Sequence, residues 1–306
     1  MTANKFNAYF TETIEPLVNE ANYIKQKYHS RFWGYFWTVF FIMTANLLWA
    51  LFNNLMYDKP LNYEQLILVN LIAVTIIFLP IYFYKRIPKN DIFDTFIQFY
   101  GHWEHLKDSE VALVHSPIIP AHDTVRAEHN VRGEYNGVQM EMRDTFYGRG
   151  NAKKQKIISG GVILFLRFKQ PFEGRILMFD KSGFYRKNKF ASMEYYNDKL
   201  NIPAANYFNI FTDNIKFAHN FLLSLFFEQI LDMKDTFAAK HMYVEITDNI
   251  VRIYFEGSRM YLDNYKFWSK PVDKKKFAQL NDTFEKSLAL VDLINVLAEP
   301  QNQYAR

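Results

Sequence analysis

Two long stretches without a charged residue constrain this chain more than any other feature of its sequence. Neither residues 32–52 nor residues 66–84 contain Asp, Glu, Lys or Arg, and most of their side chains are apolar. As helices they would be about 31 and 28 Å long, close to the roughly 30 Å hydrocarbon core of a bilayer. Buried helices of a soluble protein rarely stay uncharged over this length, so the sequence predicts two membrane-spanning helices.

The charges that flank these stretches predict the orientation of the hairpin. Basic residues lie before the first stretch and after the second, at Lys25, Lys27, Arg31, Lys85, Arg86 and Lys89. The connector, residues 53–65, has Lys59 as its single basic residue, with Asp58 and Glu64 nearby. Because Lys and Arg are enriched on the cytoplasmic side of membrane helices, we expect both termini in the cytoplasm and the connector outside.

Composition excludes several classes of protein. The two stretches contain no Asp, Glu, His, Lys or Arg, which disfavours a pump or transporter that moves charge through the membrane. The chain has no cysteine, so it has no disulfide, thiol nucleophile or thiolate metal site. A net charge of +4 is too small to indicate nucleic-acid binding, and 49% hydrophobic residues exclude a disordered chain.

Apolar seams flank the two predicted spans. In residues 1–31, spacings of three and four predict an amphipathic helix that continues into the first span. Its seam is formed by Phe10, Ile14, Leu17, Ala21, Ile24 and Tyr28. A second helix is predicted in residues 87–108, with a stripe at Phe93, Phe96, Tyr100 and Trp103. The seams fit either a stalk within one chain or a homo-oligomer. We favour contact between copies, because the membrane raises their local concentration.

Residues 109–306 predict a cytosolic α+β domain with an antiparallel sheet. Strand-like alternation marks two hairpins, 131–146 around Asn136-Gly137 and 242–256 around Asp248-Asn249. Further strands are expected at 161–168, 174–179, 193–196 and 207–212, and helices at 214–237 and 273–298. Residues 161–168 are apolar on most of both faces, which predicts a central strand. Hairpins interrupted by single helices favour this class over a doubly wound parallel sheet.

The segment His102-Trp103-Glu104-His105 is the strongest metal candidate in the sequence. If it is helical, His102 and His105 face the same side and can share an ion. In the zinc-protease motif, however, the two histidines are four residues apart. Two surface histidines are the simpler interpretation, so neither a metal nor another cofactor is predicted.

Basic residues gather in two predicted loops of the soluble half. They include Arg149, Lys153, Lys154, Lys156, Lys187 and Lys189. The nearby glycines do not precede a helix as they do in a phosphate-binding loop. Solvated loops are the simplest interpretation, and the functional alternative is weak contact with anionic lipid, at about 1 kcal/mol per base. Ser159 and Ser182 have no His and Asp partners that sequence can identify, so no catalytic residue is assigned.

The soluble half also resembles a family of bacterial membrane proteins known as domain of unknown function 3137. Three stretches carry the resemblance: NVRGEYNGVQMEMRDTFYG at 130–148, VILFLRFKQPFEGRILMFDKSG at 162–183, and residues 193–237, which begin MEYYNDKLNIP. The two preceding apolar stretches fit the layout of that family. The resemblance implies a bacterial inner-membrane protein with a cytosolic α+β domain, brings no catalytic residues, and suggests association with membrane proteins of the LemA family.

Together these features favour a non-enzymatic, membrane-anchored scaffold or subunit of an inner-membrane assembly. Its expected partners are the lipid bilayer, further copies of the chain and another membrane protein such as a LemA-family member, without nucleic acid. The alternative is a membrane-tethered enzyme, or a ligand or lipid sensor, that uses the basic loops or the segment 102–105. The expected layout is a helix at 1–31, a transmembrane hairpin at 32–86, a helix at 87–108 and the cytosolic domain at 109–306.

Overall fold

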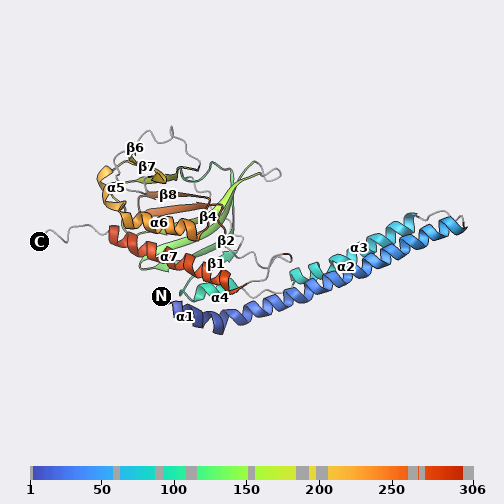
Figure 1. Cartoon of the computed structure of the whole chain (residues 1–306). Coiled ribbons are helices and arrows are strands. Elements are labelled where there is room, and N and C mark those ends of the chain that lie inside the picture. The colour runs from blue at the N-terminus through green and yellow to red at the C-terminus, as the bar shows by residue number, and fades with distance from the viewer. Residues whose placement is uncertain are drawn as a thin grey trace. The chain divides into compact units, whose positions relative to one another are not determined.

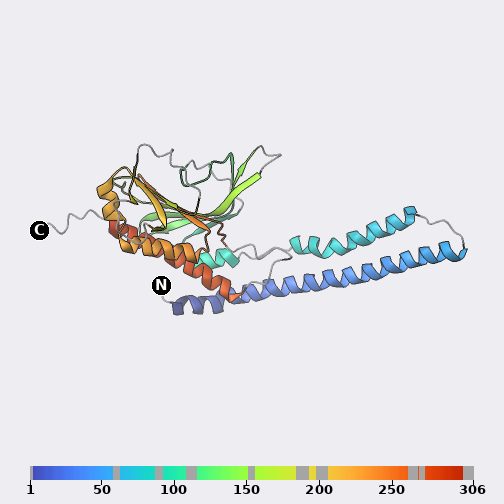
Figure 2. The same ribbon diagram turned by 45° about the horizontal axis from the view of Figure 1, so that its top comes forward.

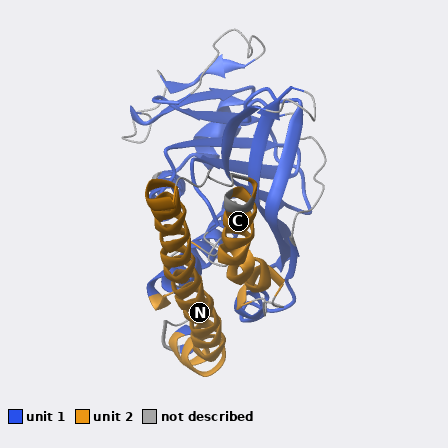
Figure 3. Cartoon of the chain, turned by 90° about the vertical axis from the view of Figure 1, so that its right-hand side faces the viewer, with its two compact units in different colours: residues 1–6, 94–261, 275–306 blue, residues 7–93, 262–274 orange. Residues whose placement is uncertain are grey.

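The chain divides into two compact units, which Figure 3 colours separately. The computed structural model describes residues 3–57, 63–86, 92–107, 116–150, 156–183, 193–197, 206–260, 268 and 273–298. One unit comprises residues 7–93 and 262–274 and contains a helical hairpin. The other comprises residues 1–6, 94–261 and 275–306 and contains a sheet with helices.

Two long antiparallel helices form the hairpin (Figures 1 and 2). They are α2 (Glu15–Tyr57) and α3 (Tyr63–Arg86), and the chain enters α2 through α1 (Ala3–Tyr9) and one π-helical turn, η1 (Phe10–Ile14). Both predicted spans are therefore helical, and the first continues the N-terminal helix as expected. Phe32 of α2 and Tyr84 of α3 are buried together, with Ile24, Tyr28, Ile77 and Ile81 packed around them.

The second unit is built on an antiparallel sheet, in which nine strands of the described residues are paired in the order β1-β2-β3-β4-β9-β8-β5-β7-β6. The strands are β1 (Glu104–Lys107), β2 (Thr124–Tyr135), β3 (Val138–Arg149), β4 (Lys156–Arg167), β5 (Ile176–Asp180), β6 (Glu194–Tyr195), β7 (Phe208–Thr212), β8 (His241–Thr247) and β9 (Ile250–Glu256). The predicted α+β class and antiparallel sheet are confirmed, and β4 lies inside the sheet as its two apolar faces predicted.

Both predicted hairpins are present. β2 and β3 are joined by Asn136 and Gly137, whose φ angles are +47° and +76°. Positive φ at both central residues belongs to a type I′ turn, which matches the twist of the strands, and Asn-Gly tolerates it. β8 and β9 are joined at Asp248, where φ is +50°. These local turns set the register of the two pairs, from Tyr135↔Val138 and from Thr247↔Ile250.

Three helices cover one face of the sheet: α5 (Ile215–Phe221), α6 (Ser224–Thr236) and α7 (Lys274–Ala298) (Figures 1 and 2). Beyond the end of α6, the Phe237 ring stacks on Phe255 of β9, with the centroids 4.0 Å apart. The two longer helices are joined at Lys286 of α7. Its Nζ donates to Asp232 Oδ1 at 2.9 Å, and its carbonyl accepts from Gln229 Nε2 at 3.1 Å.

Two predicted helices are corrected by the structure. Among the described residues of 87–108, only α4 (Ile92–Gln98) is helical, and the chain turns at Gly101, where φ is +112°. The residues that follow form β1 because they pair with β2. The helix expected at 214–237 is divided into α5 and α6 at Leu222 and Leu223, since the backbone of Leu222 leaves the helical region there. The expected C-terminal helix is confirmed as α7.

Candidate functional site

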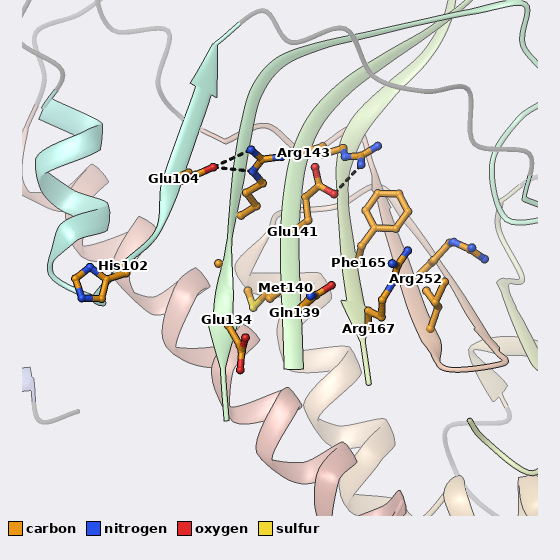
Figure 4. A pocket seen from close by; sticks show the side chains of 13 residues that line it. His102, Glu104, Glu134, Gln139, Met140, Glu141, Arg143, Phe165, Arg167 and Arg252 are labelled. Atoms are coloured by element: carbon orange, nitrogen blue, oxygen red, sulfur yellow. Dashed lines mark hydrogen bonds and ion pairs between the residues drawn. The ribbon is translucent and has the colours of Figure 1, made fainter. Parts of the chain in front are cut away.

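The sheet face opposite the helices carries a row of aligned side chains (Figure 4). From β1 to β6 the row is Glu104, Arg132, Glu141, Phe165, Arg252, Glu245, Leu177, Phe211 and Tyr195. Directly paired residues of adjacent strands point to the same face, so the strand register alone brings these residues together. The row is mostly charged near β1 and apolar near β6.

The apolar half of this face is covered by the segment that precedes β2. Ile118 and Ile119 are buried there in a cluster with Tyr147, Ile163, Leu177, Phe179, Phe211, Tyr243 and Tyr254. The polar half is open and forms a cavity of about 620 Å³ between side chains of β1, β2, β3, β4 and β9 (Figure 4). This cavity is the candidate functional site.

Two ion pairs lie in the cavity. Glu104 Oε2 accepts from both Nε and Nη2 of Arg132 at 2.8 Å, and this pair is more than half exposed. Glu141 Oε2 accepts from Arg143 Nη2 at 2.6 Å, where the side chains are 24% and 16% exposed. Burial acts to raise the pKa of Glu141, but the hydrogen bond and charge of Arg143 outweigh it and leave this pKa below its ordinary value. Glu141 is therefore a stable anion at neutral pH.

A third carboxylate, Glu245 of β8, joins the cavity to the covered half of the face. Its side chain is 3% exposed and accepts hydrogen bonds from two arginines, from Arg175 Nη2 at 2.9 Å and from Arg252 Nη1 at 2.8 Å. Ser116 Oγ donates to the same carboxylate at 2.5 Å. The two cations and the hydroxyl satisfy a charge that burial alone would disfavour.

The arginines retain donor capacity beyond these pairs. The Nε atoms of Arg143 and Arg252 are buried and have no hydrogen-bond partner among the described residues. The guanidinium carbon of Arg143 lies 4.6 Å from the centroid of the Phe165 ring, a cation–π contact that fixes its plane. Guanidinium groups held in a plane offer paired donors that match a carboxylate or a phosphate. The cavity thus has the chemistry of an oxyanion site.

The structure separates the two histidines of the metal candidate. The segment 102–105 is not helical: His102 is exposed and lines the cavity, while the His105 side chain in β1 is 2% exposed. His105 Nδ1 lies 2.7 Å from Asp94 Oδ1, and its Nε2 lies 3.0 Å from His129 Nδ1. His102 lies before β1, in the turn that follows α4, so it does not share a helix face with His105. Within the described parts of the chain, no three His, Asp or Glu side chains are placed to hold a metal ion.

The predicted basic loops are described only in part. Arg149 ends β3 and Lys156 begins β4, and the two residues are paired across the hairpin. Arg149 Nε donates to the Ala121 carbonyl at 3.0 Å, which holds it away from the cavity of β1–β4 and β9. Lys153, Lys154, Lys187 and Lys189 lie outside the described residues. Contact of these loops with anionic lipid stays a prediction.

The N-terminal seam is partly covered within the single chain. Phe10 and Ile14 are buried, at 1% and 0% exposure, whereas Leu17 and Ile24 are half-buried. Within the hairpin unit, Lys274 Nζ lies 5.5 Å from the centroid of the Phe10 ring. In this arrangement Leu17 and Ile24, but not Phe10 and Ile14, present surface to a second copy. The homo-oligomer stays a prediction.

The two serines form hydrogen bonds with carboxylates. Ser182 Oγ donates to Asp180 Oδ1 at 2.5 Å and lies 3.1 Å from His241 Nδ1, so the serine stands between the acid and the imidazole. In a catalytic triad the histidine stands between them. Ser159 Oγ donates to Glu256 Oε1 at 2.8 Å and contacts the Tyr254 hydroxyl at 2.7 Å. Both networks satisfy carboxylates of the sheet.

Comparison with known proteins gives one distant likeness. No family model matches the sequence, and no curated protein matches it. Among solved structures, the mycobacterial trehalose monomycolate transport factor A is similar with a TM-score of 0.42 and 12% identity, over 67% of this chain and 92% of that chain. A likeness at this level does not establish a shared function.

Of the cavity residues, only His102 and Glu104 were singled out from the sequence, as part of the segment 102–105. The alternation that predicted the β2–β3 hairpin already placed Gln139, Glu141 and Arg143 on one face of β3. A sequence signal was therefore present for one strand. What sequence does not provide is the pairing of β4 with β9, which brings Phe165 beside Arg252. Without that pairing, the same arginines resemble ordinary solvated positions.

Proposed function

We propose that this protein is a non-enzymatic subunit or scaffold anchored in a bacterial inner membrane by the α2–α3 hairpin, with its sheet domain in the cytoplasm. The observation that carries the proposal is the hairpin itself. Two of the described helices are long and apolar enough to cross a membrane. Two apolar helices followed by an antiparallel α+β domain also support membership of the domain of unknown function 3137 family.

The side chains of the hairpin favour lipid as its surroundings. Large apolar side chains are exposed along both helices, including Leu48 at 61%, Trp49 at 65% and Leu71 at 64%. Exposed apolar surface of this extent marks an interaction site, and a bilayer covers it without a protein partner. Water around these side chains would be unfavourable, by about 25 cal/mol per Å² of apolar surface.

Three threonine hydroxyls of the hairpin are satisfied within their own helices. The hydroxyls of Thr38 and Thr44 in α2 and Thr75 in α3 each donate to the carbonyl four residues earlier, at 2.8–2.9 Å. Such bonds remove the need for water at membrane depth. These three hydroxyls therefore fit a lipid environment, whereas the buried Oδ1 of Asn70 in α3 has no hydrogen-bond partner in the described structure.

Charge and aromatic side chains gather at one end of the hairpin. Arg31 lies 5.4 Å from the Tyr28 ring centroid in α2, and Arg86 lies 4.3 Å from the Tyr82 ring centroid in α3. Arginine and tyrosine side chains prefer the headgroup region, and basic residues favour its cytoplasmic side. This arrangement supports a cytoplasmic location for both termini.

A matched pair of variants tests the anchor. Leu71 in α3 and Leu225 in α6 have similar exposures, 64% and 62%. Leu71→Lys places a charge inside the proposed span, four residues from its centre, at a cost of up to about 3 kcal/mol. We expect it to lower the membrane-inserted fraction, while Leu225→Lys leaves that fraction unchanged. Equal behaviour of the two variants, or release of the wild-type chain from membranes by alkaline carbonate, would contradict a transmembrane anchor.

Orientation is tested separately. Reporter domains fused at the C-terminus should be active in the cytoplasm, and reporters inserted near residue 60 should be active outside. The non-enzymatic part is supported by Ser159 and Ser182, whose hydroxyls donate to Glu256 and Asp180, while His241 lies on the far side of Ser182 and not between this serine and the acid. Affinity isolation of the full chain in mild detergent, followed by mass spectrometry, tests the scaffold role. Recovery of the chain without stoichiometric membrane partners or further copies would count against that role.

A further inference from the structure

The open cavity has one aromatic side chain at its base and three arginine side chains around it. Phe165 of β4 forms the floor, and Arg143, Arg167 and Arg252 border it from β3, β4 and β9 (Figure 4). Phe165 pairs directly with Arg252, Arg167 follows Phe165 by two residues, and Arg143 contacts the Phe165 ring. We propose that this cavity binds a small soluble oxyanion with at least two negative charges, carried on phosphate or carboxylate groups.

The ion pairs of the lining leave one arginine and one glutamate over. Four arginines and three glutamates line the cavity. Arg132 and Arg143 are paired with lining glutamates, and Arg252 is paired with Glu245 beyond the cavity. Arg167 is exposed and makes no hydrogen bond or ion pair with any described residue, and the same holds for the lining glutamate Glu134. Gln139 lies between these two in the strand register, so an anion at the Arg167 corner meets a guanidinium without displacing an existing partner.

The paired arginines supply the remaining donors. Arg143 and Arg252 each use one terminal nitrogen for their glutamates, while the Nε of each is buried and out of reach of a ligand in the cavity. The remaining donors are the terminal N–H groups that these bonds do not use, and an oxyanion with two or more oxygens can accept from them and from Arg167 together. A single charged oxygen cannot reach three separate guanidinium groups, so the polyvalent ligand is favoured.

Size and polarity limit the ligand further. A volume of about 620 Å³ is within the range of small-molecule sites. Gln139 pairs with Arg167 across β3 and β4 and is exposed, so its amide adds a neutral donor and acceptor at the same corner. The lining therefore suits a compact ligand of metabolite size with oxygen atoms on more than one side.

Two exposed residues provide the test without disturbing the buried pairs. The full chain in mild detergent is titrated with pyrophosphate and, separately, with citrate at constant ionic strength, by calorimetry. We expect saturable binding of at least one probe and a loss of about tenfold or more in Arg167→Gln and in Gln139→Glu. A melting curve for each variant confirms that it is folded, since exposed substitutions change stability little.

Two controls match these variants in chemistry. Lys216→Gln removes an exposed cation of α5 that does not line the cavity, and Gln279→Glu adds a carboxylate to an exposed position of α7. Both should bind the probes as the wild type does. Preference for pyrophosphate identifies a phosphate ligand, and preference for citrate identifies a polycarboxylate. Binding that persists in Arg167→Gln and Gln139→Glu, binding that is lost in Lys216→Gln, or no saturable binding at millimolar concentration would overturn the proposal. None of these results bears on the membrane anchor.

Discussion

Glu245→Gln is the most informative single substitution in the sheet domain. The carboxylate is 3% exposed and accepts from Arg175, Arg252 and the Ser116 hydroxyl. A glutamine has nearly the same size, so the change creates no cavity. Its amide keeps one accepting oxygen, but its NH₂ group then faces donors. The substitution therefore removes charge and hydrogen-bond acceptance while it preserves packing.

The expected loss of unfolding free energy follows from these contacts. A hydrogen bond to a charged group contributes about 1.5–3 kcal/mol. The pair with Arg252 approaches this range, because that side chain is 18% exposed. The pair with Arg175, which is 37% exposed, contributes less because solvent screens it. We expect a total loss of about 2–3 kcal/mol, or about 4–12 °C in the melting temperature of a unit of this size.

Tryptophan fluorescence measures this loss in the sheet domain alone. Trp103 is the single tryptophan of the sheet unit among five in the chain. The others are Trp33, Trp37, Trp49 and Trp268. With these four replaced by phenylalanine, denaturant unfolding in detergent reports the sheet domain. Glu228→Gln, at an exposed position of α6, should change stability by less than about 0.5 kcal/mol.

The same substitution connects stability to the cavity. Loss of the Glu245 charge frees Arg252 Nη1 at the cavity border, so pyrophosphate or citrate should bind more tightly even though the domain is less stable. A stability equal to that of Glu228→Gln would refute the reasoning, because it would mean that the buried carboxylate and its arginines do not stabilise the fold.

Three further outcomes are expected. Gly161→Ala should destabilise the sheet by about 1–3 kcal/mol in denaturant unfolding, because a Cβ there would collide with the Phe255 backbone. Gly34→Ala should cause no loss of stability, because nothing lies near its Cβ position and alanine is favoured over glycine inside a helix such as α2. The hydrogen bonds and charge that lower the pKa of Asp180 outweigh burial, which raises it, and hold this pKa below its ordinary value of 3.8. Asp180 therefore contributes to the stability of the sheet domain above pH 3.8, and this contribution is lost as pH falls through the folded-state pKa. Asp180→Asn should remove this acid dependence. Burial raises the pKa of Tyr254 above its ordinary value of 10.0, so stability should fall as pH rises beyond 10.0, and less so in Tyr254→Phe.

Local signals predicted much of the fold. Asn136-Gly137 predicts its hairpin because only a few residue types accept positive φ at both turn positions. The spacing of Phe277, Leu280 and Phe284 predicts α7 because all three must face one side to be buried. The spans are predicted because charge is absent over a whole membrane thickness. Each of these features is decided by residues close together in the sequence.

The failures have a non-local cause. Residues 99–107 show helical spacing of aromatics, but Trp103 packs on Gly133 of β2, where any larger side chain would collide with the indole. That contact and the pairing of β1 with β2 place Glu104 and His105 in a strand. The spacing of Tyr100 and Trp103 is still used, since both rings pack on Phe284. Tertiary packing thus keeps the two aromatic rings on one buried side, although the residues that follow Gly101 form a strand and not a helix.

The location of the cavity follows from how the second sheet face is divided. Where the strands carry Ile163, Tyr243 and Tyr254, Ile118 and Ile119 can cover them and gain apolar burial. Where the strands carry arginines and glutamates, the same cover would remove charges from water at a cost greater than apolar contact returns. That half therefore stays open, and its guanidinium groups keep donors that no described side chain uses. An incoming oxyanion satisfies those donors at lower cost than an apolar segment, because it brings the opposite charge with it.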